Sequence, residues 1–135
     1  MTGPSSPKNQ LVGDSRPLVF AVDDEPMLLE LVVVVLESQG FRVQTFRDPA
    51  TAVRAFSLSR PRPELIITDF AMHAMTGLDL IRDCRRIHPP QKILMVSGTV
   101  DEEVYKKSPF KPDKFLAKPY TATQLTETVT ALLSP

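Results

Sequence analysis

Short apolar runs alternate along this chain with longer segments whose apolar residues recur at helical spacing. Most of these runs are continuous, which is typical of strands buried on both faces of a sheet. The run at residues 41–46 instead alternates, with Phe41, Val43 and Thr45 on one side. The pattern predicts strands at Leu18–Val22, Phe41–Phe46, Leu65–Thr68, Ile93–Val96 and Phe115–Ala117.

Start and stop signals frame a helix after most of these strands. Pro26 and Pro49 suit the first turn of a helix, where a missing N–H costs nothing. Asp48 is a suitable N-cap and Gly40 is typical of a helix C-terminus. The β-branched run Val32–Val35 favours a strand, but the framed segment is too long for one. The predicted helices are Pro26–Gln39, Pro49–Ser59, Gly77–Ile87 and, opened by a Thr121–Gln124 capping box, Thr121–Leu132. The apolar face of the third has helical spacing and consists of Leu78, Ile81, Cys84 (or Leu80) and Ile87.

The order of elements predicts the fold. Strands that alternate with helices are parallel, because each helix carries the chain back across the sheet. Right-handed crossovers then give an α/β fold of the doubly wound (βα)5, flavodoxin-like type. We expect a three-layer sandwich with a five-stranded parallel sheet. The second strand is followed by only Arg47 and Asp48, so we expect it at an edge.

The length of 135 residues predicts a single folded domain. Residues 1–16 are polar and contain Pro, Gly and Ser, so we expect a flexible N-terminal arm there. The folded domain is expected to occupy residues 17–135.

Composition narrows the class of protein. The 16 basic residues balance the 16 acidic ones, which argues against a general nucleic-acid binder. The single cysteine, Cys84, cannot form an internal disulfide, and this favours a reducing compartment. No apolar run is long enough to cross a bilayer, and the start has no secretory pattern. We therefore expect a cytoplasmic protein without a membrane partner.

Polar side chains follow four of the predicted strands. They are Asp23 and Asp24, then Asp69, Ser97 and Lys118. Because ligands bind at the carboxyl ends of the strands in such sheets, we expect these side chains to meet there. Neighbouring carboxylates repel unless cations lie between them, and Lys118 with a hard cation such as Mg²⁺ would supply that charge. The set predicts a site for phosphoryl transfer, in which one carboxylate attacks phosphorus in line.

On these residues the sequence resembles the receiver domains of two-component response regulators. The likeness runs from about Pro17 to Leu133, and it rests on four motifs in order, each at a strand end. Each motif alone is weak, but the four together are specific. They are VFAVDDEP, LIITDFAMHAMTG, ILMVSGT and FLAKPY.

The resemblance implies a metal site and a phosphoryl acceptor. Asp69 would accept the phosphoryl group, and Asp69 with Asp24 would bind Mg²⁺ directly. Asp23 would bind the ion through water, and the backbone carbonyl of Ala71 would complete the protein ligands.

The resemblance also implies how phosphorylation is sensed. Ser97 would donate a hydrogen bond to the phosphoryl group and Lys118 would pair with it. Phe115 matches the aromatic switch position, which would respond to movement of Ser97. The Lys118–Pro119 peptide bond would be cis.

The implied partners are a histidine kinase or histidine phosphotransfer protein as donor and an unspecified downstream protein. The domain would catalyse only its own phosphorylation and dephosphorylation, and is in that sense not an enzyme. We expect no DNA-binding domain in this chain. One alternative is an Mg²⁺-dependent phosphatase with an aspartyl nucleophile, although such enzymes usually have a second Asp where this chain has Ala71. A degenerate receiver that only binds partners is the other alternative.

Two segments depart from the family pattern. His73 stands where proline is usual, and we expect an ordinary loop residue because Mg²⁺ prefers oxygen ligands. Between Thr99 and Lys114, Pro109 and Pro112 would interrupt the helix that the family has there. We expect a short or irregular helix, limited to about Asp101–Lys107.

Overall fold

A five-stranded sheet organises the molecule. The computed structural model describes residues 14–98, 103 and 106–134. Its strands lie in the order β2-β1-β3-β4-β5, and every neighbouring pair is parallel, which confirms the predicted sheet. The strands are β1 (Leu18–Val22), β2 (Arg42–Phe46), β3 (Leu65–Asp69), β4 (Ile93–Ser97) and β5 (Lys114–Ala117).

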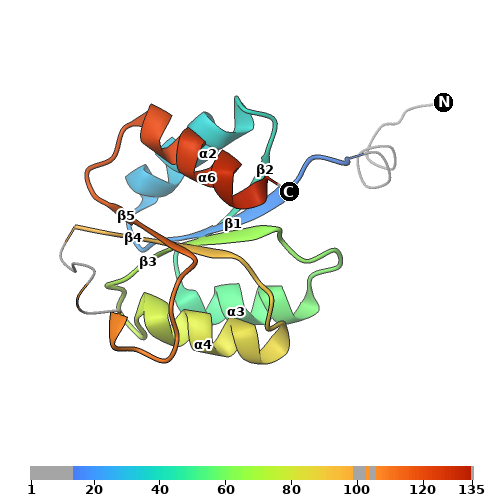
Figure 1. Cartoon of the computed structure of the whole chain (residues 1–135). Coiled ribbons are helices and arrows are strands. Elements are labelled where there is room, and N and C mark those ends of the chain that lie inside the picture. Colours follow the sequence, from blue (N-terminus) through green and yellow to red (C-terminus); the bar gives the residue numbers. More distant parts are fainter. Residues whose placement is uncertain (1–13, 99–102, 104–105, 135) are drawn as a thin grey trace.

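Helices cover both faces of this sheet, as the fold class predicts. Figure 1 shows α2 and α6 packed on one face and α3 and α4 on the other, which makes three layers. The helices with described bounds are α2 (Pro26–Glu37), α3 (Pro49–Leu58), α4 (Gly77–Ile87) and α6 (Ala122–Leu133), and the described residues Glu103 and Lys106 are also helical. None of them is long and apolar enough to span a bilayer.

The sheet separates two apolar cores. Val19 and Ala21 of β1 face α2 and α6, whereas Phe20 and Val22 face α3 and α4. All five residues of β1 are therefore buried, because successive side chains point to opposite, covered faces. This burial explains why the central strands have continuous apolar sequences.

Strand β2 lies at an edge, as predicted. Its Gln44 and Thr45 are exposed, and only Phe46 is buried. The ring of Phe46 packs on Phe20 with 4.8 Å between centroids. The predicted apolar alternation is thus wrong at Thr45, because its face of the edge strand is open to solvent here, while Phe46 on the other face is buried.

Helix ends follow the predicted signals with some corrections. Asp48 accepts a hydrogen bond from Thr51 N at 3.1 Å, and Thr121 with Gln124 forms the predicted capping box. Helix α2 ends at Glu37, earlier than predicted, and Gly40 follows it with φ +93°. Ile87, expected on the apolar face of α4, is 38% exposed, while Leu80 is fully buried.

Most of the predicted fourth helix, Asp101–Lys107, lies outside the described residues, as do residues 1–13 of the predicted arm. Residues 107–113 are described and contain no helix, in keeping with Pro109 and Pro112. At the N-terminal end of the described residues, Asp14 Oδ2 lies 3.5 Å from Arg42 Nε of β2.

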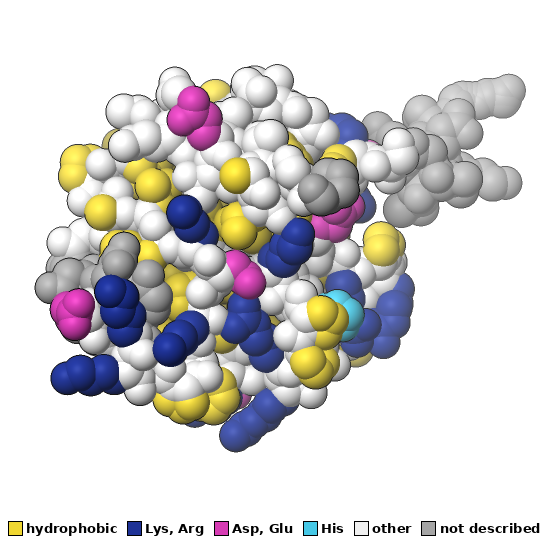
Figure 2. All heavy atoms as spheres, viewed as in Figure 1, with side chains coloured by type: hydrophobic (Ala, Val, Ile, Leu, Met, Phe, Trp, Pro, Cys, Tyr) yellow, Lys and Arg dark blue, Asp and Glu magenta, His cyan; other side chains and the backbone are white. Residues whose placement is uncertain are grey.

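The approach to β5 is basic and is tied to α4. Arg85 of α4 pairs with Asp113 at 2.7 Å and also donates to the carbonyl of Lys111. Lys and Arg side chains gather on the lower half of the face in Figure 2, over α4 and the segment before β5. Charge is therefore unevenly distributed although the chain is neutral.

Candidate functional site

Five of the predicted site residues lie at the carboxyl edge of the sheet. Asp23 and Asp24 follow β1 directly, Asp69 ends β3, Ser97 ends β4, and Lys118 follows β5. The strand register makes these ends level, since Val22 pairs with Thr68, Asp69 with Val96, and Ser97 with Ala117.

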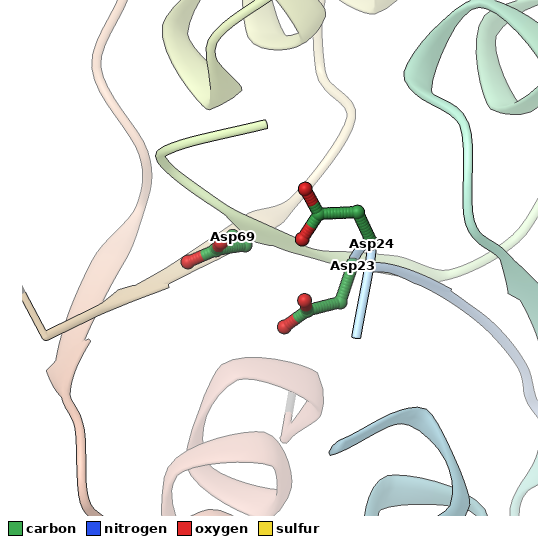
Figure 3. A group of neighbouring side chains, drawn as sticks. All are labelled: Asp23, Asp24 and Asp69. Atoms are coloured by element: carbon green, nitrogen blue, oxygen red, sulfur yellow. The ribbon is translucent and has the colours of Figure 1, made fainter. Parts of the chain in front are cut away.

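Three carboxylates form a compact cluster there. Each of Asp23, Asp24 and Asp69 offers an oxygen within 4.8 Å of the others. Figure 3 shows Asp23 and Asp24 diverging from the end of β1, with both carboxylates on the side where Asp69 lies. Asp23 and Asp69 are buried, and Asp24 is partly exposed. Oxygen ligands in this number and spacing suit a hard divalent cation.

Lys118 bridges two of the carboxylates. Its Nζ lies 3.1 Å from Asp23 Oδ2 and 3.2 Å from Asp69 Oδ1. One ammonium against three carboxylates leaves two negative charges uncompensated within the cluster. The cluster therefore has the charge to hold a divalent cation in addition to Lys118.

The pKa values of Asp69 and Lys118 are both raised in this cluster. Burial raises the pKa of Asp69, and the charge of Asp23 adds to this, although the nearby Lys118 acts in the opposite direction. Burial lowers the pKa of Lys118, but its hydrogen bonds and charge interactions with Asp23 and Asp69 outweigh this and leave the pKa raised. The lysine thus stays charged, and the Asp69 carboxylate is destabilised until another cation joins it.

Backbone hydrogen bonds hold the edge in place. Lys118 N donates to Ser97 O at 2.9 Å, so the ends of β4 and β5 are joined beside the cluster. Gly77 N donates to Phe70 O at 2.8 Å, which closes the loop after Asp69. A Cβ at Gly77 would lie 2.6 Å from the carbonyl oxygen of Asp69, so α4 can approach β3 this closely only at a glycine. The Lys118–Pro119 bond is cis, as the resemblance implied.

The other predicted residues take places around the cluster. Ser97 is buried at the end of β4, and Phe115 is half-buried on β5, where it pairs with Met95 of β4. Ala71 lies exposed in the loop after Asp69, and its role as a carbonyl ligand stays a prediction.

One contact at this site had no sequence signal. His73 is in the expected loop and its side chain is 94% exposed, yet its Nε2 lies 3.4 Å from Asp24 Oδ2. Two helices and two strands lie between these residues along the chain, so only the folded structure brings them together.

The family model described as the response regulator receiver domain matches residues 19–130. Two relatives are regulators of transcription by name. The probable transcriptional regulatory protein TcrX of Mycobacterium tuberculosis is 29% identical over 123 residues, which are 89% of this chain and 51% of that protein. SphR of Synechococcus elongatus, an alkaline phosphatase synthesis transcriptional regulatory protein, is 31% identical and covers 85% of this chain and 48% of its own length. The chain thus spans about half the length of these curated relatives.

Solved structures share the fold. The chemotaxis protein CheY4 of Vibrio cholerae superposes with a TM-score of 0.81 at 25% identity, covering 88% of this chain and all of that one. A response regulator receiver protein from Sinorhizobium medicae gives a TM-score of 0.79 at 26% identity, covering 88% and 95%.

Proposed function

The chain belongs to the family of response regulator receiver domains, and on this premise we propose that Asp69 accepts a phosphoryl group with the aid of Mg²⁺. The observation that carries the proposal is the cluster of Asp23, Asp24 and Asp69, with Lys118 bridging two of its carboxylates. Such a set can bind a cation, present a nucleophile and neutralise a phosphoryl group in one place.

Asp24 and Asp69 are the proposed direct ligands of the metal, with Asp23 bound through water and the carbonyl of Ala71 as a further ligand. Bound Mg²⁺ would supply charge neutralisation and orient the phosphoryl oxygens. Asp23 is fixed for this role, because its Oδ1 accepts a hydrogen bond from Glu25 N at 3.0 Å and its Oδ2 contacts Lys118.

Transfer from a phosphohistidine requires one bond to form and one to break. A carboxylate oxygen of Asp69 attacks phosphorus, the P–N bond breaks, and the imidazole nitrogen keeps the electron pair. Lys118 Nζ, already 3.2 Å from Asp69 Oδ1, is close enough to neutralise the transferred group. Ser97 at the end of β4 would donate its hydroxyl to another phosphoryl oxygen.

The proposed response is a shift between two conformations. Attraction of Ser97 to the phosphoryl group would favour a conformation in which Phe115 turns further into the protein. Adjacent strands connect the two residues, since β4 and β5 pair along their length. Such a shift would change the surface around β5, where an unidentified downstream protein could distinguish the two states.

The surface of α2 supports a docking site for the donor, a histidine kinase or histidine phosphotransfer protein. Met27, Leu31 and Val34 are 80%, 41% and 67% exposed. Their spacing puts these apolar side chains on one stripe of the helix. The helix begins at Pro26, two residues after Asp24, so a protein bound to this stripe would adjoin the cluster.

A cytoplasmic location and the lack of enzymatic turnover belong to the same proposal. The buried, unpaired thiol of Cys84 is compatible with a reducing compartment. A receiver that modifies only itself should release one phosphate for each phosphoryl group it accepts.

Mass spectrometry after incubation with acetyl phosphate and Mg²⁺ tests the proposal. We expect a single phosphoryl adduct on the parent protein and none on Asp69→Asn. Asp83→Asn, which changes a carboxylate in the second turn of α4 and outside the cluster, is the matched control and should be modified normally. An unmodified parent, or equal modification of Asp69→Asn, would contradict the assignment. If each chain instead released many phosphates from a donor that is not an acyl phosphate, the phosphatase alternative would be favoured.

A further inference from the structure

His73 adjoins the carboxylate cluster from the solvent side. Its Nε2 is 3.4 Å from Asp24 Oδ2, and Asp24 is the most exposed of the three carboxylates. Because the His73 side chain is 94% exposed, no packing would resist a small rotation of the ring. The described residues therefore place an imidazole nitrogen beside Asp24, one of the three carboxylates of the cluster.

The separation suits two ligands of one cation. Ligand atoms about 2.1 Å from a metal lie about 3.4 Å apart on a tetrahedral ion and about 3.0 Å apart on an octahedral one. The observed 3.4 Å lies within reach of both geometries. An ion that bound Asp24 could thus also bind His73 with little movement.

Imidazole does not serve all cations equally. Mg²⁺ prefers oxygen and would gain little from His73, whereas imidazole is a strong ligand for Co²⁺, Zn²⁺ and related ions. We propose, resting on the metal site of the proposed function, that His73 is an additional ligand which shifts the preference of this pocket from Mg²⁺ toward divalent transition-metal ions.

A rival explanation of the same contact is a plain ion pair between a charged His73 and Asp24. The two explanations predict opposite effects of His73→Ala. Removing a competing cation would strengthen the binding of every divalent ion. Removing a ligand would weaken the binding of Co²⁺ and leave that of Mg²⁺ unchanged.

The experiment is calorimetric titration of the full chain with CoCl₂ and, separately, with MgCl₂, without a phosphodonor. Parent, His73→Ala and His88→Ala are compared. His88, the only other histidine of the chain, lies at the far end of α4 and is the matched control. We expect His73→Ala to weaken Co²⁺ binding at least about tenfold. Loss of a residue that only hydrogen-bonds to a metal ligand already weakens metal binding by about tenfold or more, and loss of a ligand should do no less. The visible Co²⁺ spectrum should change with it, because a nitrogen ligand is lost.

Several results would overturn the inference. Co²⁺ and Mg²⁺ affinities that rise together in His73→Ala would identify an ion pair, and an unchanged Co²⁺ affinity or an equal loss in His88→Ala would exclude a specific ligand. If any of these results came with normal Mg²⁺-dependent phosphorylation of Asp69, the role of His73 would be rejected and the proposed function would stand. Failure of the parent to bind either ion would instead contradict the proposed metal site, and the inference with it.

Discussion

At the scale of single residues, the carboxylate cluster is arranged for binding and not for stability. Asp23 and Asp69 share Lys118, whereas the side chain of Asp24 contacts the highly exposed His73. Exposed contacts contribute little to stability, so we expect Asp24 to gain less from His73 than it loses by repulsion from the neighbouring carboxylates. The free energy of unfolding should therefore depend on which charges the pocket contains.

Replacing Asp24 tests this balance. We expect Asp24→Asn to raise the midpoint of thermal unfolding in EDTA by a few degrees, which corresponds to about 1 kcal/mol of relieved repulsion. Added MgCl₂ should raise the midpoint of the parent more than that of the variant, because an ion that binds only the folded state stabilises it. Circular dichroism during heating measures both. A lower midpoint for Asp24→Asn in EDTA would show that the cluster is not under repulsion.

At the scale of elements, the positions of helix ends determine how the site is assembled. Helix α4 begins at Gly77, where its backbone approaches the end of β3. Its start is fixed by a capping box between Thr76 and Asp79. The close approach of helix to strand sets the path of the loop that follows Asp69.

Gly77→Ala should disturb this junction. The new Cβ would lie 2.6 Å from the carbonyl oxygen of Asp69 and 3.2 Å from Met95 Sδ, so backbone must move. We expect a loss of about 1–3 kcal/mol in urea unfolding, as for overpacked cores, together with slower phosphorylation. Gly98→Ala is the control, because its Cβ would meet Lys118 Cβ at an ordinary 3.6 Å. Equal stability of the two variants would refute the steric explanation.

The N-cap of α3 gives a prediction about pH. Hydrogen bonds from the side chain and backbone of Thr51 lower the pKa of Asp48 below its ordinary value of 3.8. A lowered pKa means that the charged form is stabilised by folding, so the contribution is present above pH 3.8 and is lost as pH falls through the folded value. The stability difference between the parent and Asp48→Ala, measured by urea unfolding, should therefore shrink below that pH. Asp48→Asn keeps a capping oxygen that does not titrate. The difference in free energy of unfolding between Asp48→Asn and Asp48→Ala should therefore persist at low pH.

At the scale of the whole molecule, the sheet separates two cores that contact its opposite faces. Leu125 of α6 belongs to one core and Ile81 of α4 to the other, and both are fully buried. The carboxyl edge of the sheet is shared by both layers, so packing on either face supports the site.

Substitutions in the two cores should act independently. We expect Leu125→Ala to cost about 2–5 kcal/mol and Ile81→Val about 0.5–1.5 kcal/mol. The double variant should show their sum within about 0.5 kcal/mol, because the residues share no partners across the sheet. Urea unfolding of the four proteins forms the cycle, and Met27→Ala, at an 80% exposed position, is the near-neutral control. A larger deviation would mean that the sheet transmits strain between the layers.

Most of the architecture was predictable from local patterns. Continuous apolar runs indicated β1, β3 and β4, and prolines and caps indicated where helices begin. Errors fell where the surroundings decide exposure: Thr45 lies on an edge strand, and Ile87 occupies the last turn of α4. The candidate site was predictable because each polar residue directly follows a strand, and parallel strands bring such positions to one edge.

The distances within the site depend on the tertiary structure alone. Lys118 reaches Asp23 across 95 residues and Asp69 across 49, and no local pattern specifies which carboxylates it bridges. The contact between His73 and Asp24 likewise arises from how one loop lies over another strand's end. Strands, caps and the order of polar residues follow from interactions between near neighbours in the chain. Contacts between remote side chains depend on how all layers pack together, which is why they emerge only in the folded molecule.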